Sequence, residues 1–413
     1  MSYPVDRVRV LYSFPHKLGA DRICYTAWQQ VNGLASAGAE LVVFPGAQSR
    51  PVPAGVRVHP TLARGKIRIP YKLIGSRRAF ALHDALVARR LRRLAGQVDI
   101  VHTWPLGALR TLKVAKELGI PTVLERPNAN TRFAYEVVRQ ECEQLGMALP
   151  PGHEHAYNAD ALRLEEEEYR LADALLCPSD FVRQTFLDRG FSPGRLARHQ
   201  YGFDEQAYFP ADEPRDASQG LTMIFAGGCA PRKGLHYALK AWLQSPAHRT
   251  GTFSIAGAFV PGYAEKLAPM LDHPSVRVLG HRRDLPELMR KSDCLVLPSI
   301  EEGSALVTYE ARGSGCVLLV SEGAGAMCKH LKTGLVHSVG DVATLTEHIT
   351  MLHEDRALLE RLRRASLNTA REVTWTAAGA RLVQVYREVI ATLQATTDTA
   401  RSEELRHQGA RLA

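Results

Sequence analysis

Two carboxylates with a glycine and a serine between them follow an apolar run in the C-terminal half of the chain. Glu302 is followed directly by Gly303 and Ser304, and Glu310 lies eight positions after Glu302. The preceding run, CLVLPS, is typical of a buried strand, and a helix is expected from about Ala305. The free amides and the dipole of a helix start favour an anion, and a glycine there lets a phosphate approach the backbone. The pattern therefore predicts a phosphate site between two carboxylates.

The spacing of the two carboxylates fits one ligand that is bound at both ends. At about 1.5 Å of rise per helical residue, Glu310 lies roughly 9–12 Å beyond the helix start. That is about the span from the anomeric carbon of a sugar across a diphosphate to a ribose. Glu302 would hold sugar hydroxyls or stabilise an oxocarbenium-like state, and Glu310 would accept hydrogen bonds from both ribose hydroxyls. The spacing alone leaves the alternative of a capped helix with two solvated acids.

A second glycine-rich stretch, FAGGCAPRKG, also joins a strand-like run to a helix in the same half of the chain. Gly227 and Gly228 follow the apolar run, and Arg232 and Lys233 stand before Gly234. Two adjacent cations at such a loop suit a diphosphate, because charge-assisted hydrogen bonds to phosphate oxygens are strong. A glycine-rich loop is a weak signal by itself, but the two loops together favour a nucleotide-diphosphate site over a capped helix.

Short apolar runs alternate with helix-like segments along the chain, as in parallel βαβ units. We expect an α/β fold of two doubly wound domains that face each other across a cleft, with ligands at the carboxyl ends of the strands. A chain of 413 residues is also too long for one ordinary core. The expected strands are 8–14, 40–46, 99–104, 121–126, 174–179, 196–202, 221–228, 251–258, 276–280, 294–299, 316–321 and 334–340. The expected division is 1–208 and 221–375 for two Rossmann-like domains, 209–220 for a linker, 376–395 for a C-terminal helix and 396–413 for a polar tail, frayed or disordered.

The composition is that of a soluble globular protein, with 45% hydrophobic and 23% charged residues. The sequence contains no run of roughly eighteen apolar residues, so no transmembrane helix is expected. The first residues lack the layout of a signal peptide. The seven cysteines are scattered without a CxxC pair, which favours reduced thiols in a cytoplasmic protein over disulfides or a zinc site. No acidic cluster has the pattern of a metal site, so neither a metal nor another cofactor is expected.

The net charge of +9 favours anionic partners, and cations are concentrated between residues 64 and 93. Asp84 is the only acid of this segment, and apolar side chains are interleaved with its cations. A solvated basic face explains the segment, and so does peripheral docking on anionic lipid at the inner face of the cytoplasmic membrane. Nucleic acid is not expected as a partner, because no nucleic-acid-binding motif accompanies the cations. The cations are Arg64, Lys66, Arg68, Lys72, Arg77, Arg78, Arg89, Arg90, Arg92 and Arg93.

Several stretches together resemble the family 4 retaining glycosyltransferases of the GT-B fold, which use nucleotide sugars. PSIEEGSALVTYEARGSGCVLLVS is similar to the family's Glu-x7-Glu motif, and APRKG is similar to its Lys-Gly loop. LADALLCPSDFVRQTF with YGFDEQAYFP resembles the segments that close the N-terminal domain, and EVTWTAAGARLVQVY resembles the C-terminal helix that returns to that domain. The resemblance covers nearly the whole chain, and it implies a first domain for the acceptor and a second for the donor.

The resemblance implies a role for each matching residue. Glu302, which the spacing selects over Glu301, would lie by the donor sugar, and Glu310 would bind the ribose. Lys233 would stabilise the diphosphate leaving group, and the backbone at the helix start would lie by the distal phosphate. Glu302 and Lys233 are thus the expected catalytic residues. The expected donor-binding residues are Arg232, Gly227, Gly228, Gly303, Ser304, Ala305 and Glu310.

The chain departs from the family pattern on both sides of the expected cleft. Gly228 stands where the family often has an arginine, and Arg232 is expected to replace it. In ERPNANT, Asn130 stands where many members have a histidine, and an asparagine can hold hydroxyls but cannot shuttle protons. After the first strand, only one glycine of a family glycine pair is kept, beside Asp21 and Arg22. The candidates on the acceptor or sugar side are Gly19, Asp21, Arg126, Asn128, Asn130 and His102.

We expect a retaining transfer from a UDP- or GDP-linked sugar to a glycan or lipid-linked acceptor in polysaccharide or cell-envelope glycan synthesis. In this family the departing phosphate is usually proposed to take the acceptor proton, and closure of the cleft excludes water. Three alternatives stay open at this point. They are a catalytically silent subunit that binds nucleotide sugar or glycan, another GT-B enzyme such as a sugar-nucleotide epimerase or a phosphorylase, and a transferase that acts on nucleic acid.

Overall fold

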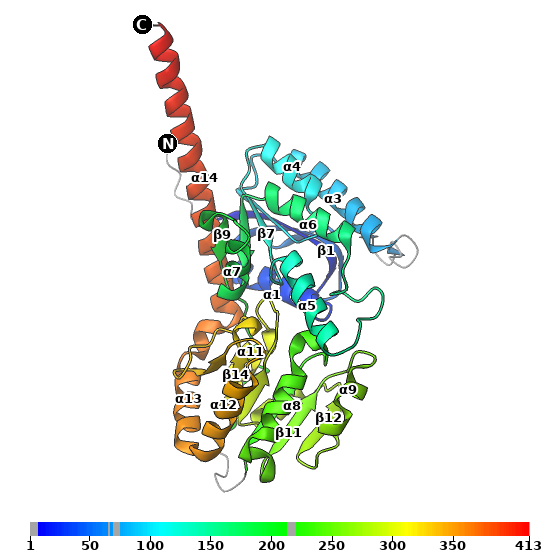
Figure 1. Cartoon of the computed structure of the whole chain (residues 1–413). Coiled ribbons are helices and arrows are strands. Elements are labelled where there is room, and N and C mark those ends of the chain that lie inside the picture. Colours follow the sequence, from blue (N-terminus) through cyan, green and yellow to red (C-terminus); the bar gives the residue numbers. More distant parts are fainter. Residues whose placement is uncertain (1–6, 65–66, 69–74, 213–219, 413) are drawn as a thin grey trace.

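The computed structural model describes residues 7–64, 67–68, 75–212 and 220–412 (Figure 1). Two α/β domains lie next to each other along the long axis of the molecule, and the last helix runs from one along the other. This arrangement confirms the expected pair of doubly wound domains. Parts of the basic segment (65–66 and 69–74) and of the expected linker (213–219) lie outside the described residues.

The N-terminal domain is built on a parallel sheet with the strand order β3-β2-β1-β6-β7-β8-β9. Each run expected as a strand in this half is confirmed, and β3 is an addition that the sequence did not predict. The strand order reverses between β1 and β6, which makes a crevice at their carboxyl ends. The strands are β1 (Arg9–Leu18), β2 (Glu40–Gln48), β3 (Arg57–Val58), β6 (Ile100–Thr103), β7 (Thr122–Glu125), β8 (Ala174–Cys177) and β9 (Leu196–Arg198). The helices are α1 (Ile23–Ser36), α3 (Ser76–Arg93), α4 (Leu109–Glu117), α5 (Thr131–Gln144), α6 (Ala159–Leu171) and α7 (Asp180–Leu187).

The C-terminal domain repeats this plan with the strand order β12-β11-β10-β13-β14-β15. Its expected strands are all confirmed. The order reverses between β10 and β13, and these are the strands that precede the two loops singled out in the sequence. The strands are β10 (Thr222–Ala226), β11 (Thr252–Ala256), β12 (Val276–Gly280), β13 (Cys294–Leu297), β14 (Val317–Ser321) and β15 (Gly334–His337). The helices are α8 (Leu235–Gln244), α9 (Tyr263–Leu271), α10 (Leu285–Arg290), α11 (Leu306–Gly313), α12 (Val342–Glu354) and α13 (Arg356–Asn368).

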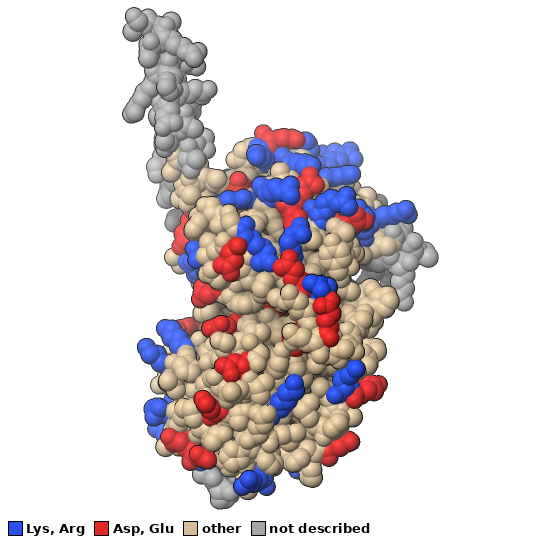
Figure 2. All heavy atoms as spheres, viewed as in Figure 1, with Lys and Arg blue, Asp and Glu red and all other residues tan. Residues whose placement is uncertain are grey.

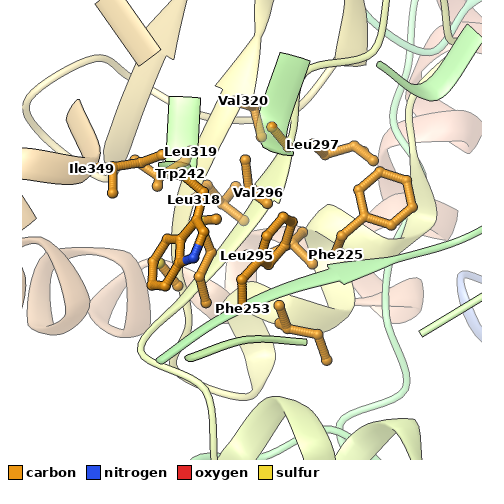
Figure 3. Close-up of a cluster of buried hydrophobic side chains, with 14 of the residues drawn as sticks. Phe225, Trp242, Phe253, Leu295, Val296, Leu297, Leu318, Leu319, Val320 and Ile349 are labelled. Carbon is orange, nitrogen blue, oxygen red and sulfur yellow. The ribbon is translucent and has the colours of Figure 1, made fainter. Parts of the chain in front are cut away.

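The core of the C-terminal domain explains why its strands are almost continuously apolar. Helices cover both faces of a parallel sheet, so consecutive side chains of a strand are buried on opposite faces. Leu295, Val296 and Leu297 of β13 are fully buried, and Phe225 and Trp242 pack in the same cluster (Figure 3). This packing fixes the ends of β10 and β13, and with them the loops that follow.

Helix α14 (Trp375–Leu412) leaves the C-terminal domain and packs on the N-terminal domain against α1 (Figure 1). Two glycines allow the close approach, since a Cβ atom on Gly379 would lie 2.3 Å from the carbonyl carbon of Gly33. The helix continues to Leu412, through the tail expected to be frayed or disordered. That tail contains alanine, arginine, leucine and glutamate, which favour a helix.

Candidate functional site

Glu302 lies beyond the carboxyl end of β13, in the loop that leads to α11. Its side chain is 7% exposed and faces the two cations that follow β10. The Nη1 atom of Arg232 lies 3.0 Å from Oε2 of Glu302, and Nζ of Lys233 contacts Oε1. Ser299 Oγ donates to the same carboxylate at 3.4 Å. Residues chosen from two separate loops of the sequence therefore meet in one charged cluster.

The glycine after the two cations brings the loops together. Gly234 has a φ of +66°, and a Cβ atom on it would lie 2.0 Å from the carbonyl oxygen of Pro298. No other residue type fits this position, because both the conformation and the space demand glycine. The amide of Ile300 also donates to the Arg232 carbonyl at 2.9 Å. The backbone thus sets Arg232 and Lys233 beside the Glu302 loop.

The cations keep Glu302 ionised in spite of its burial. Burial acts to raise the pKa of Glu302, but the charges of Arg232 and Lys233 outweigh it and hold that pKa below its usual value. Burial lowers the pKa of Lys233, and the Glu302 charge opposes this. A phosphate oxygen beside Lys233 would further favour its protonated form, because a nearby opposite charge stabilises a charge.

The glycine pair after β10 borders open space. Gly227 has a φ of +144°, which residues other than glycine rarely adopt. A Cβ atom on either Gly227 or Gly228 would meet no described atom within 4 Å. The backbone of this loop therefore faces free volume, as expected where a ligand approaches the main chain closely.

Helix α11 begins at Leu306, one residue after the predicted start, with Ala305 as its cap. The amide of Ala305, expected at the phosphate, already donates to the Ala324 carbonyl at 3.2 Å. The Oγ atom of Ser304 lies 2.7 Å from the Tyr309 hydroxyl and donates to the Gly325 carbonyl at 2.8 Å. The amide of Thr308 donates to the Ala305 carbonyl at 3.0 Å, so the first-turn amides left for an anion are those of Leu306 and Val307.

Glu310 lies on α11, half-buried, and is hydrogen-bonded to the hydroxyl of Tyr208. Burial raises the pKa of Glu310 to about 7, and the bond from Tyr208 opposes this rise. The carboxyl group therefore changes its charge near neutral pH. Hydroxyl donors from a ligand would favour the ionised form, because hydrogen bonds to a carboxylate stabilise its charge.

At Gly303 the two domains are in direct contact. A Cβ atom there would lie 1.8 Å from the carbonyl oxygen of Pro127, in the loop after β7. The carbonyl of Gly303 accepts a hydrogen bond from Ser179 Oγ at 2.5 Å, and Glu301 accepts one from the amide of Ala129 at 3.0 Å. The glycine thus makes room for the N-terminal domain, which explains it more directly than the close approach of a phosphate that the sequence suggested.

Three of the expected side chains on the acceptor side have partners within the fold. Arg126 is 2% exposed, and its guanidinium donates to Glu165 at 2.8 Å. Asn130 caps α5, because its Oδ1 accepts from two amides of the first turn. His102 is fully buried, and its Nδ1 lies 2.6 Å from the hydroxyl of Tyr386. These contacts give the three side chains a structural role, and their contact with a sugar or acceptor stays a prediction.

The other candidates of the N-terminal domain lie in loops after its strands. Asn128 is half-buried, and a Cβ atom on Gly303 would lie 3.1 Å from the backbone nitrogen of Asn128. Gly19 follows β1 with a φ of +81°, and Asp21 beside it is exposed. These residues are placed at the carboxyl edge of the sheet, where doubly wound domains bind ligands.

Sequence reasoning missed two residues that shape the site. Tyr208 bonds Glu310, and its signal was present in the YGFDEQAYFP stretch, which was read only as a domain boundary. Glu301 was set aside because Glu302 fits the spacing, yet it holds the loop of the other domain. Among the described residues, no group of three or more histidine, cysteine, aspartate or glutamate side chains is placed to hold a metal ion.

Models of known families match both halves of the chain. The model described as Glycosyltransferase Family 4 matches residues 25–206, and the model described as Glycosyl transferases group 1 matches residues 220–355. The two matches fall on the two domains in the order in which the chain builds them.

Individual relatives extend this result. A D-inositol 3-phosphate glycosyltransferase of Salinispora arenicola is 25% identical over 400 residues, which cover 87% of this chain and 85% of the relative. An N,N'-diacetylbacillosaminyl-diphospho-undecaprenol alpha-1,3-N-acetylgalactosaminyltransferase of Campylobacter jejuni is 30% identical over 122 residues, only 29% of this chain and 32% of the relative. The solved structure of Anabaena HepE in complex with UDP-glucose has 18% identity and a TM-score of 0.61, over 94% of this chain and 99% of that one. The structural likeness shows a shared fold.

Proposed function

Because the chain belongs to the glycosyltransferases of group 1 and family 4, with the GT-B fold, we propose that it moves a sugar from a nucleotide-diphosphate sugar to a hydroxyl of a glycan or lipid-linked acceptor, with retention of configuration. The observation that carries the proposal is the contact of Glu302 with Arg232 and Lys233 between the ends of β10 and β13. A buried carboxylate, two cations and the amides of a helix start are together suited to a sugar diphosphate.

The chemistry follows from the charges of this cluster. Lys233 and Arg232 would bind the diphosphate and stabilise the charge that develops as the bond from the anomeric carbon to oxygen breaks. Glu302 would stabilise positive charge on the sugar. The acceptor hydroxyl attacks on the face that the phosphate leaves, and a phosphate oxygen takes its proton. Asn130 offers no base, since its side chain caps α5. The cations supply this stabilisation in our proposal without a metal ion or another cofactor.

Glu310 would bind the nucleotide end of the donor. Its place on α11 puts a carboxyl group further along the helix than Glu302, and an ionised carboxylate can accept bonds from both hydroxyls of a ribose. A 2′-deoxy nucleotide would lose one of these bonds. The donor in this proposal is therefore a ribonucleoside diphosphate sugar.

The acceptor is proposed to be a sugar on a lipid carrier, as the name of the Campylobacter relative describes for that protein. Cations gather on the N-terminal domain over α3 and α4 (Figure 2). Arg77 pairs with Asp160 and Arg92 with Glu117, so part of this charge is neutralised, and Leu82 beside it is 39% exposed. Docking of α3 on anionic lipid would bring the cleft to the acceptor. None of the helices in the described ranges has the length and apolar character needed to span a membrane.

Vesicle sedimentation tests the docking. The protein should sediment with vesicles that contain phosphatidylglycerol and stay in solution with phosphatidylcholine alone. Sedimentation should weaken as salt rises, because the attraction is electrostatic. Equal behaviour with both vesicles would remove the membrane from the proposal and leave the transfer reaction in place.

The transfer reaction is tested by the release of nucleoside diphosphate from a panel of UDP- and GDP-linked sugars. We expect one donor to be consumed and the Glu302→Gln variant to lose about 10²–10³-fold in rate, the cost of removing one electrostatic group from such a site. The matched control is Glu322→Gln, an exposed glutamate of the same domain. Release at the wild-type rate by Glu302→Gln would remove this residue from the mechanism.

A catalytically silent nucleotide-sugar-binding protein is the second candidate. The observation in its favour is Gly228, which leaves open space where the family often has an arginine. Binding of a nucleotide sugar without any release of nucleoside diphosphate, with or without acceptor, would decide for this candidate.

A further inference from the structure

The segment between α5 and α6 crosses from the N-terminal domain to the C-terminal domain. Figure 1 shows the loop after α5 at the side of the N-terminal domain that faces the other domain. Met147 and Leu149 of this segment pack in one cluster with Ile300 and Tyr237, which belong to the C-terminal domain. Ile300 precedes the Glu301–Glu302 pair directly. The segment is therefore anchored beside the loop that carries Glu302.

Further along the segment, His153, Glu154 and His155 form a charged cluster with Arg22 in the loop after β1. Oε1 of Glu154 lies 3.6 Å from Nε2 of His155 and 3.9 Å from Nη1 of Arg22. The amide of His155 donates to Nδ1 of His153 at 3.2 Å, and the two imidazole rings are 5.7 Å apart. The His155 side chain is 11% exposed, whereas that of Glu154 is 63% exposed. A nearly buried histidine thus lies beside a glutamate side chain that is largely exposed to solvent.

This cluster lies within electrostatic reach of the donor loop. The contact with His155 lowers the pKa of Glu154 to about 2, and the charges of Arg22 and Arg232 contribute to the shift. Arg232 is the guanidinium that also contacts Glu302. Glu154 is therefore an ionised carboxylate of the N-terminal domain, in a segment that is anchored beside the Glu302 loop.

The backbone at Arg22 supports a functional reading of the same place. Arg22 has a φ of +58°, which is unusual for a residue other than glycine. Such strained positions cluster at functional sites, where the surrounding structure holds them. Arg22 also stands after β1, at the sheet edge where ligands of doubly wound domains bind.

An exposed aromatic ring extends the cluster along the segment. Tyr157 is 66% exposed, and its ring packs edge-on against Tyr135 of α5 at 5.4 Å between centroids. Tyr157 lies three positions after Glu154, so their Cα atoms are at most about 10 Å apart. A carboxylate and an exposed aromatic face at this separation offer complementary contacts to one sugar, hydroxyls for the first and C–H groups for the second.

We propose that the segment from His153 to Tyr157 is the acceptor subsite, in which Glu154 and His155 bind hydroxyls of the acceptor sugar and Tyr157 packs on its ring. The inference rests on the proposed function and assigns to the acceptor residues that neither the sequence motifs nor the comparisons assign. It also names the ligand class: a sugar ring, presented either on a lipid carrier or free in solution.

The test measures transfer and hydrolysis of the same donor by the full chain. The donor is the nucleotide sugar that gives the fastest release of nucleoside diphosphate. The acceptor probes are N-acetylglucosaminyl-diphospho-undecaprenol in detergent micelles and methyl α-N-acetylglucosaminide in solution, which separate a lipid-linked from a free sugar. Glu154→Gln should raise the KM of the accepting probe and lower the ratio of transfer to hydrolysis about 10- to 100-fold, the usual weight of a hydrogen bond to a charged group.

Three controls separate binding from folding. Glu143→Gln should leave the ratio unchanged, because Glu143 is 61% exposed and pairs with an arginine as Glu154 does, but lies on α5. Tyr157→Ala should lower the ratio, and Tyr157→Phe should restore it, since the phenyl ring keeps the packing face. Thermal unfolding of Glu154→Gln should match the wild type.

Three results would overturn the inference. A wild-type ratio in Glu154→Gln and Tyr157→Ala would show that the segment does not touch the acceptor. A parallel fall of hydrolysis and transfer would place the defect in the donor site. Transfer by the wild type to neither probe, with the donor still hydrolysed, would exclude this sugar class as the acceptor. Failure of the proposed function is a separate result, because then no donor is consumed in a Glu302-dependent way.

Discussion

Replacing Gly303 by alanine should force the two domains apart at the site without removing any polar group. The new Cβ atom would lie 1.8 Å from the carbonyl oxygen and 2.4 Å from the carbonyl carbon of Pro127. An ordinary contact begins near 3.4 Å, so the gap must open by about 1.6 Å. Side-chain rotation offers no escape, because the atoms on the other side are backbone. That loop is also held by Glu301 and by the capping side chain of Asn130.

A misplacement of about 1 Å can cost an enzyme on the order of 10²-fold in rate. We therefore expect Gly303→Ala to lower kcat for transfer by about 10²-fold. UDP binding should change much less, because Arg232, Lys233 and Glu310 all lie on the C-terminal side of the contact. Steady-state kinetics and calorimetry with UDP measure the two effects. Gly194→Ala is the control, since a Cβ atom there meets no described atom within 4 Å. A kcat within twofold of the wild type would refute the assignment of Gly303 to domain contact.

Three further changes have distinct expected outcomes. UDP affinity should fall as the pH drops below about 7, because protonation of Glu310 removes a hydrogen-bond acceptor, and calorimetry should show no such slope for Glu310→Gln. Because folding raises the pKa of Glu310, the contribution of this group to folding stability is full below its ordinary pKa and is lost as the pH rises through 7. Glu310→Gln should therefore raise the melting temperature at pH 8 more than at pH 5. Glu141→Gln should cost about 1–3 kcal/mol in urea unfolding, because Glu141 of α5 lies 2.6 Å from Nε2 of His236 across the domain boundary; an unchanged midpoint would argue against the contact. Tyr386→Phe should cost a similar free energy by removing the bond to His102, while the KM of the donor stays constant; a changed KM would show that His102 acts on the site.

The alternation of apolar runs and helix-like segments was enough to predict both sheets, because a strand buried on both faces must be almost entirely apolar. The meeting of Glu302 with Lys233 was also predictable, since the two residues follow strands on either side of the switch point of one sheet. Such positions converge in any doubly wound domain. Tyr208 could have been included by the same reasoning, had its stretch been read for side chains as well as for a boundary.

The residues of the N-terminal domain were harder to read, because their roles depend on partners far away in the sequence. Arg126 is neutralised by Glu165, 39 positions later, and no local pattern shows this pairing. Asn130 is different, because an asparagine directly before a helix is a common N-cap, and that signal was available. The family histidine at its place drew attention to a ligand and away from the backbone amides that Asn130 satisfies.

Arg232 ties the donor cluster to the contact between the domains. Its Nη1 atom donates to the carbonyl of Glu301 at 2.6 Å and lies 3.0 Å from the carboxylate of Glu302. The carboxylate of Glu301 lies 3.4 Å from the same atom. It accepts a hydrogen bond from the backbone amide of Ala129, which belongs to the other domain. A diphosphate that binds Arg232 therefore competes with both glutamates and changes the charge balance at the domain contact. Coupling between two binding events is reciprocal, so if the donor binds Arg232 as proposed, docking of the N-terminal loop would change donor affinity by the same factor. If Arg232 takes the place of the arginine missing at Gly228, as proposed, that cation also contacts the glutamate that holds the loop of the other domain.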